Sequence, residues 1–248
     1  MTKEKNKTYR DSHSSEGYGQ RYRRTYEKGY YHYQWIYLER PLIERLFKEL
    51  VADGAKSYLD FACGTGRILS VAESFFNETT GVDVSESMLA EARSLCNRSM
   101  ILNMDLTSDH LPDTFDVITA FRFFLNAEDE LRSGALKAIS GLLSERGVFL
   151  ANIHVNRRSI LGYVYRVRNR ILKKTTANIE GYEEFENLLQ SNGFKIENVY
   201  WYSFLPRTGW HFEWFPKYFM KPVERMWMKI PCLPKGIAQS FLCVCRKK

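Results

Sequence analysis

The chain has 248 residues, of which 44% are hydrophobic, and a formal net charge of +7 at neutral pH. This length allows one large α/β domain with a substantial core and is too short for two complete enzymes. The polar first 20 residues and the lack of any apolar run of about 18 residues predict neither a secretory signal nor a membrane-spanning helix.

The positive charge is concentrated in three segments. Residues 1–30 carry eight Lys/Arg and four Asp/Glu, residues 157–174 carry seven Lys/Arg and no acid, and residues 204–235 carry six Lys/Arg and two acids. The three segments together carry +15, so the rest of the chain carries −8. This distribution predicts an acidic core that bears basic additions.

The five cysteines match no zinc-binding spacing and suggest no disulfide framework. We therefore expect reduced thiols and a cytoplasmic location, with a peripheral position on the inner face of the membrane as an option.

Residues 1–20 read as a tail, and residues 30–52 predict a helix that Pro41 kinks or breaks. Strands and helices then alternate, which predicts βαβ units and a parallel sheet with helices on both faces. The expected strands are 57–62, 79–84, 100–104, 115–121, 147–154, 194–204 and 240–246. The expected helices are 66–76, 85–96 with Ser85 as N-cap, 127–144 and 181–192.

Two segments exceed what a minimal α/β domain needs. Residues 157–178 follow the fifth strand, and residues 205–239 separate the last two strands. Insertions of this length are usually functional, so both are expected to form caps.

A glycine-rich turn joins the first strand to its helix in the segment 58–69, YLDFACGTGRIL. Gly64 and Gly66 allow a tight turn and a close approach of ligand to backbone, and Asp83 ends the next strand, where an acid can bind ribose hydroxyls. A dinucleotide would also fit this pattern. Two features argue against it: Leu69 replaces the third glycine of the dinucleotide fingerprint, and Asp60 would repel a pyrophosphate but suit an amino group.

These residues resemble the class I S-adenosylmethionine-dependent methyltransferases, closely over residues 55–155. Asp60-x-Ala-x-Gly-x-Gly66 is similar to their first motif, Met104-Asp105-Leu106 to the third-strand motif and 115–121 to the fourth-strand motif. The resemblance implies S-adenosylmethionine as cofactor, S-adenosylhomocysteine as product and no metal. It places these residues at the cofactor: Asp60, Ala62, Gly64, Gly66, Asp83, Val84, Met88, Asp105, Leu106 and Phe121.

The resemblance also implies a Rossmann-like, mostly parallel sheet of seven strands in the order 3-2-1-4-5-7-6, with residues 240–246 as the antiparallel strand. It implies a tail and N-terminal helical lid over residues 1–54 and a methyltransferase domain over residues 55–248 that carries the two caps.

The carboxyl ends of the fourth and fifth strands face the ligand crevice in such sheets. His154 is the candidate general base, and Arg122 would either bind an anionic acceptor or pair with Glu128 or Asp129. The sequence after the fourth strand lacks the Pro-Pro motif of amine-methylating relatives, and no cysteine stands where cytosine-methylating relatives need one. Methylation of nucleic-acid bases is therefore disfavoured.

Residues 18–37 contain eight Tyr or Trp, and tyrosines 22, 26, 30, 33 and 37 recur at three- and four-residue spacing, which predicts one helical stripe. The two interpretations of this stripe are a lid over cofactor and acceptor and a face packed on the domain as core. The candidate acceptor-binding residues are Tyr22, Tyr26, Tyr30, Trp35, Asn126, Asn156 and Trp210. The second insertion mixes aromatic and basic residues, which suits an anionic membrane interface, a cleft for a ring-containing anion or a cap packed inward.

The sequence thus predicts methyl transfer to an O or N atom of a small polar or anionic acceptor. A sugar, a nucleotide sugar or a lipid-linked glycan would fit, as in polysaccharide biosynthesis. The alternatives are an RNA methyltransferase whose basic caps bind phosphates, although nucleic acid is the less favoured partner, and a cofactor-binding module without turnover.

Overall fold

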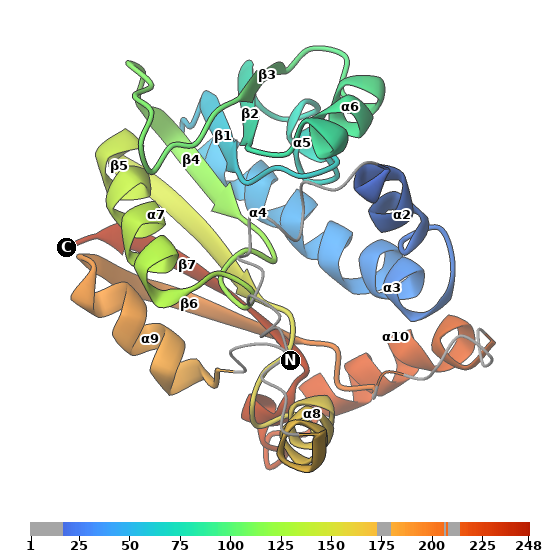
Figure 1. Cartoon of the computed structure of the whole chain (residues 1–248). Helices are drawn as coiled ribbons and strands as arrows, with labels where there is room; N and C mark the ends of the chain where they lie inside the picture. Colours follow the sequence, from blue (N-terminus) through green and yellow to red (C-terminus); the bar gives the residue numbers. More distant parts are fainter. Residues whose placement is uncertain (1–16, 173–179, 206, 208–213) are drawn as a thin grey trace, which may run out of the picture.

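The computed structural model describes residues 17–172, 180–205, 207 and 214–248, and it contains one seven-stranded sheet (Figure 1). The strand order is β3-β2-β1-β4-β5-β7-β6, with β7 antiparallel to both neighbours and the other pairs parallel. The strands are β1 Ser57–Phe61, β2 Glu78–Asp83, β3 Met100–Asn103, β4 Phe115–Ala120, β5 Leu143–Ile153, β6 Phe194–Tyr202 and β7 Ser240–Lys247. The predicted fold class and strand order are confirmed.

Helices cover both faces of the sheet, as Figure 1 shows. The α-helices are α2 Tyr18–Arg24, α3 Gly29–Gln34, α4 Arg40–Ala52, α5 Leu69–Ala72, α6 Glu86–Leu95, α7 Asp129–Leu142, α8 Ile160–Leu172, α9 Tyr182–Ser191 and α10 Trp214–Lys229. A π-helical turn, η1 Trp35–Glu39, lies between α3 and α4, and a short 3-10 turn, η3 Lys235–Ile237, precedes β7.

Alternate strand residues build two apolar cores. Leu59, Ile118 and Phe149 pack with α7 and α9 on one face of the sheet. Tyr58 and Val117 pack with α4 and α5 on the other. Because side chains alternate along a strand, the continuous apolar strands of the sequence are explained by burial on both faces.

The N-terminal helical segment differs from its prediction at Pro41. The chain runs without a break from α3 through the π turn into α4, and Pro41, the second residue of α4, directly follows the π turn and has no N–H to donate to the preceding turn. The irregularity is therefore the π turn that ends at Glu39, and Glu39 is buried. Such π turns occur frequently at functional sites.

The tyrosines of residues 18–37 do not form one helical stripe. Residues 25–28 separate α2 from α3, and Gly29 adopts a φ of 72°, a left-handed conformation that interrupts the helix. The helix expected over residues 66–76 is regular only at α5, and β5 begins earlier than expected because Leu143 already pairs with Phe115.

Both insertions contain a helix, α8 in the first and α10 in the second. Of the predicted acceptor residues, Trp210 lies outside the described residues, as does most of the expected tail over residues 1–20. Among the helices that the structure describes, none is both long and apolar enough to cross a bilayer.

Candidate active site

A cavity of about 280 Å³ lies at the carboxyl ends of β1, β2 and β4, beneath α2 and the turn that follows it. Of the residues predicted to bind cofactor or acceptor or to act in catalysis, those that line it are Tyr22, Tyr26, Asp60, Ala62, Gly64, Asp83, Val84, Met88, Asp105, Leu106, Phe121, Arg122, Asn126 and His154. The position is the usual ligand crevice of an open α/β sheet.

Asp83 holds the glycine-rich turn against the end of β2. Its Oδ2 accepts a hydrogen bond from the Gly64 backbone N–H at 2.9 Å, and its Oδ1 accepts one from the Ser85 N–H at 2.8 Å. Both carboxylate oxygens are therefore fixed in orientation at the cavity wall. A carboxylate held in this way can accept hydrogen bonds from vicinal hydroxyl groups of a ligand.

The turn itself has three residues with left-handed backbone. Ala62, Gly64 and Gly66 have φ values of 55°, 56° and 75°. A Cβ on Gly64 would stand 3.7 Å from the Met88 side chain, inside the cavity wall, so glycine leaves room for a ligand there. A Cβ on Gly66 would stand 3.0 Å from Ala92, so this glycine serves the packing of α6 and does not line the cavity.

Asp60 is buried at the end of β1, with 2% of its surface exposed. Its Oδ1 accepts a hydrogen bond from the Thr119 hydroxyl at 2.8 Å. Burial outweighs this hydrogen bond and the attraction of Arg67, and raises the pKa of Asp60 to about 7. A cationic group placed beside this carboxyl would stabilise its ionised form.

The wall between Asp83 and β3 is mainly apolar. Met88 and Leu106 are buried there, and Val84 is partly exposed. Asp105 also lines this wall, and its Oδ1 accepts hydrogen bonds from the backbone and the hydroxyl of Thr107. A flat apolar ring with polar edges would suit this surface.

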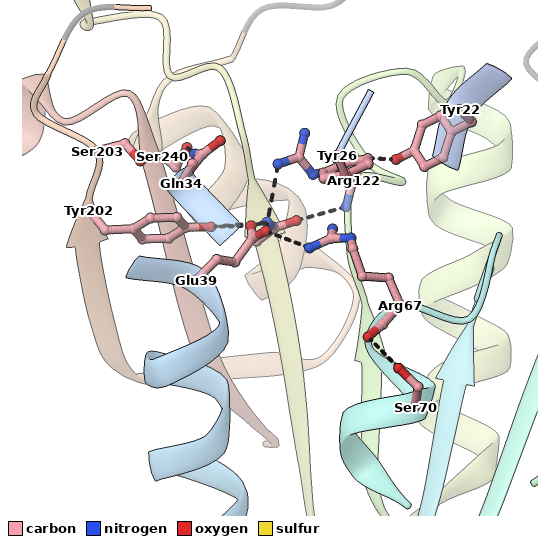
Figure 2. Close-up of polar contacts among 11 residues, drawn as sticks. Tyr22, Tyr26, Gln34, Glu39, Arg67, Ser70, Arg122, Tyr202, Ser203 and Ser240 are labelled. Atoms are coloured by element: carbon pink, nitrogen blue, oxygen red, sulfur yellow. Dashed lines mark hydrogen bonds and ion pairs between the residues drawn. The ribbon is translucent and has the colours of Figure 1, made fainter. Parts of the chain in front are cut away.

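A buried ionic cluster lies at the opposite side of the cavity, centred on Glu39 (Figure 2). Arg67 Nη1 donates to Glu39 Oε2 at 2.9 Å, and Arg122 Nη2 lies 3.6 Å from the same oxygen. The Tyr202 hydroxyl and Asn152 Nδ2 donate to Oε1 at 2.9 and 3.2 Å. Burial alone would raise the pKa of Glu39, but the two guanidinium groups and these hydrogen bonds lower it to about 2.

Arg122 is the cavity residue with the least satisfied polar side chain. Its side chain is 8% exposed, and its Nε and Nη2 are buried without a hydrogen-bond partner among the described residues. The guanidinium carbon lies 5.1 Å from the ring centres of both Tyr26 and Tyr31. The backbone of Arg122 has a φ of 60°, and its N–H donates to Asn152 Oδ1 at 2.7 Å.

Arg122 therefore pairs with Glu39 and not with Glu128 or Asp129, the partners considered from the sequence. Two arginines surround one glutamate in this cluster, which leaves one positive charge without a carboxylate partner in it. Buried charges are normally paired, so the side of the cavity that Arg67 and Arg122 line is electrostatically suited to an anion.

His154 lies at the end of β5 and lines the cavity. Burial, together with the nearby Arg122, lowers the pKa of His154 to about 3, so its imidazole is neutral at pH 7. Its Nδ1 is buried with no hydrogen-bond partner among the residues described. The side chain is thus placed where a base could act, but its basicity is low.

Aromatic rings cover the cavity. The Tyr22 and Tyr26 hydroxyls are 3.1 Å apart, and the Tyr26 ring lies 4.3 Å from the Arg67 guanidinium carbon. Burial raises the pKa of Tyr26, so its hydroxyl stays protonated. Asn126 joins this side of the wall and donates to the Arg122 carbonyl at 3.4 Å.

Three predicted acceptor residues do not line this cavity. Tyr30 is buried and donates its hydroxyl to the Leu205 carbonyl, and Trp35 stacks on the outer side of Arg67 at 4.2 Å. Asn156 is fully buried and donates to the carbonyls of Gly236 and Ala238. Asn156 thus fixes the chain before β7.

Sequence reasoning missed Glu39, Arg67 and Tyr31 as parts of the site. A glutamate after the apolar turn 35–38 and an arginine directly after Gly66 were the available signals. Neither reveals the other as its partner, because they are 28 residues apart.

Residues 59–151 match a protein-family model described as a methyltransferase domain. A protein of Geobacillus sp. (strain WCH70) named "Putative methyltransferase" is 32% identical over 144 residues, which cover 52% of this chain and 58% of that protein. The chain therefore matches less than two thirds of the length of this relative.

Solved structures share the fold at low sequence identity. The magnesium protoporphyrin IX methyltransferase of Synechocystis PCC 6803, crystallised with bound S-adenosylhomocysteine, is 18% identical, with a TM-score of 0.63 over 96% of this chain and 97% of that one. Human N-acetylserotonin methyltransferase with S-adenosylmethionine is 16% identical, with a TM-score of 0.63 over 98% and 59%. An S-adenosylmethionine-dependent methyltransferase of Clostridium acetobutylicum is 15% identical, with a TM-score of 0.59 over 92% and 98%.

Proposed function

We propose that this protein, which resembles the class I S-adenosylmethionine-dependent methyltransferases in its matched segment and its fold, transfers a methyl group to a small anionic acceptor. The resemblance predicted from the sequence is confirmed by these two findings. The observation that carries the proposal is one cavity with two unlike sides: Asp60, Gly64 and Asp83 on one, and Arg122 with tyrosine rings on the other.

The first side suits S-adenosylmethionine, which supplies a methyl group already activated on a sulfonium. Asp83 is oriented to accept from ribose hydroxyls, and Met88 and Leu106 offer an apolar wall to an adenine ring. Asp60, whose pKa burial raises to about 7, is suited to the ammonium group of the methionine moiety. A pyrophosphate would instead place two further negative charges beside these acids.

The second side suits an acceptor that carries a negative charge. The arginine excess around Glu39 and the unsatisfied Nε of Arg122 favour a carboxylate or phosphate there. A sugar ring or a flat aromatic group can lie against Tyr26 and Tyr31. A charged sugar, a nucleotide sugar or a lipid-linked glycan therefore remains the acceptor class that we propose.

The reacting atom is an oxygen or a nitrogen. Since His154 is a weak base at its pKa of about 3, the acceptor atom should need little help in losing a proton. The residues of the cavity then contribute mainly by aligning the acceptor and excluding water, and Tyr22 and Tyr26 cover the cavity as a lid would.

The test has two steps. Calorimetry should show S-adenosylhomocysteine binding to the native protein and at least about tenfold weaker binding to Asp83→Ala, whereas the exposed-site control Glu78→Gln binds as the native protein does. An S-adenosylmethionine with a labelled methyl group, incubated with cell extract, should then label a low-molecular-weight anion.

Three outcomes contradict the proposal. Equal and negligible binding to native protein and Asp83→Ala would remove the cofactor assignment. Label that appears in RNA would show that the acceptor is RNA and not a small anion. Tight cofactor binding with no labelled product in any extract would show that the protein binds the cofactor without transferring its methyl group.

A further inference from the structure

Helix α8 turns its apolar side away from the protein. Ile160, Val164, Val167 and Ile171 recur at the spacing of about 3.6 residues per turn that places them along one stripe. Their exposed fractions are 57%, 52%, 40% and 72%. A surface helix normally buries such a stripe against its own core, whereas α8 meets the protein through Gly162 and the half-buried Leu161 and Tyr165.

The flanks of this stripe are basic. Arg168 and Arg170 lie on its two sides by the helical period, and α8 contains no acidic residue. The arginines just before α8, Arg157 and Arg158, pair with Glu184 and Glu183. Glu183 and Glu184 are therefore paired with these two arginines and do not neutralise Arg168 and Arg170.

Helix α10 presents a second surface of the same kind. Trp214 and Tyr218 are 54% and 62% exposed, and the basic residues Lys217, Lys221, Arg225 and Lys229 recur every four residues among them. The single acid of α10, Glu224, is turned inward, where it accepts hydrogen bonds from the backbone N–H groups of Ser203 and Phe204. Figure 1 shows α8 and α10 at the same end of the molecule, opposite α6 and β3.

We propose that α8 and α10 dock the protein on the surface of an anionic lipid bilayer. An apolar stripe bordered by arginines matches the boundary between acyl chains and headgroups, where long basic side chains extend to the phosphates. Aromatic residues with polar edges, as on α10, favour the same boundary. A second copy of this chain would cover the apolar stripe but bring the same positive charge to it, so the charge complementarity favours anionic lipid.

The inference does not depend on methyl transfer, and its test uses the full-length protein. Native protein should sediment with vesicles of phosphatidylcholine containing about one third phosphatidylglycerol, and at least about tenfold less with phosphatidylcholine alone. Raising the salt from about 0.1 M to about 0.5 M should weaken the binding, because counterions screen the lipid charge.

Two pairs of substitutions separate the apolar contribution to vesicle binding from the electrostatic one. Val164→Asn with Ile171→Asn removes apolar burial and should weaken vesicle binding at least about tenfold. Arg168→Gln with Arg170→Gln should weaken binding to anionic vesicles about twenty-five-fold, at about fivefold for each arginine. The matched control is Met100→Asn with Arg98→Gln, an exposed apolar and basic pair at the opposite end of the molecule, which should bind as the native protein does.

The substituted side chains are exposed, so thermal unfolding of all variants should match the native protein. The proposal is overturned if native protein binds neither vesicle, or if the control loses as much binding as the α8 variants. It is also overturned if Val164→Asn with Ile171→Asn converts a dimer to a monomer without changing vesicle binding, because the stripe is then an interface between copies. If the protein binds RNA tightly, keeps this binding after the apolar substitutions and does not bind vesicles, the basic surface is a site for RNA and the proposal is overturned.

Discussion

The replacement Asp60→Asn should stabilise the protein in the absence of ligand. Asp60 is 2% exposed, and its Oδ1 accepts a hydrogen bond from the Thr119 hydroxyl. An asparagine has the same shape, its carbonyl oxygen can accept the same hydrogen bond, and it carries no charge that burial would penalise.

The magnitude follows from the pKa of the carboxyl. Burial raises it from an ordinary 3.8 to about 7. At about 1.4 kcal/mol for each pH unit, the ionised carboxylate destabilises the folded state by about 4 kcal/mol above pH 7. The sign follows because the folded state binds the proton more tightly than the unfolded state, so the penalty is absent below pH 3.8 and grows as the pH rises to about 7.

Urea denaturation at pH 5 and pH 8 measures this difference. Asp60→Asn should exceed the native protein in free energy of unfolding at both values, and by about 2 to 3 kcal/mol more at pH 8 than at pH 5. The control Asp113→Asn replaces an exposed carboxyl and should change little at either pH.

A gain that is equal at the two pH values would refute the reasoning, since a pH-independent gain cannot come from an ionisation. A loss of stability at pH 8 would refute it as well. If the prediction holds, Asp60→Asn should also bind S-adenosylhomocysteine more weakly, because the amide cannot pair with an ammonium group. The native residue would then favour ligand binding at a cost in stability.

Two further substitutions test the buried ion pairs at Glu39 and the packing of the glycine-rich turn. Glu39→Gln should lower the free energy of unfolding by about 3 to 5 kcal/mol at pH 7, because it leaves Arg67 and Arg122 buried without a carboxylate. Since the pKa of Glu39 is about 2, the loss relative to native protein in urea denaturation should shrink as the pH falls from 4.5 toward 2, and a constant loss would contradict the ion-pair account. Gly66→Ala should cost about 1 to 3 kcal/mol, because its Cβ would stand 3.0 Å from Ala92 at a φ of 75°, whereas Gly141→Ala in α7, where nothing lies within 4 Å, should be neutral or stabilising in thermal unfolding. Equal effects at the two glycines would contradict this packing argument.

The fold was predictable because its evidence is local. The strand and helix periods alternate along the chain, and the turn at Gly64 and Gly66 needs only neighbouring residues to be recognised. Right-handed crossovers then restrict how the strands can be ordered. The cofactor side of the cavity was predictable for the same reason, since Asp60, Gly64 and Asp83 all stand at strand ends.

The acceptor side was only partly predictable because it depends on contacts between distant segments. Arg122 could be placed at the end of β4, but its partner Glu39 comes from a π turn 83 residues earlier. The tyrosine periodicity misled because Gly29 breaks the helix that the spacing implied. Tyr26 and Tyr30 therefore point to different places, the first into the cavity and the second to the Leu205 carbonyl.

Periodicity also cannot say which way an apolar face points. The stripe on α8 is evident in the sequence, but a stripe facing the core and a stripe facing outward have the same spacing. Only the exposed fractions along α8 distinguish the two.

The Glu39 cluster connects the N-terminal helices, which cover the cavity, to the sheet beneath them. Glu39 belongs to the N-terminal helices, whereas Arg122 follows the end of β4 and Asn152 lies in β5. The Asn152 side chain contacts both Glu39 and the Arg122 backbone. Because Glu39 engages Nη2 of Arg122 and leaves Nε without a partner, an anion bound at Nε would add to the Glu39 contact and need not displace it. Acceptor binding should therefore tighten the N-terminal helices on the sheet, and the same contact that recognises charge would hold the cavity closed to water.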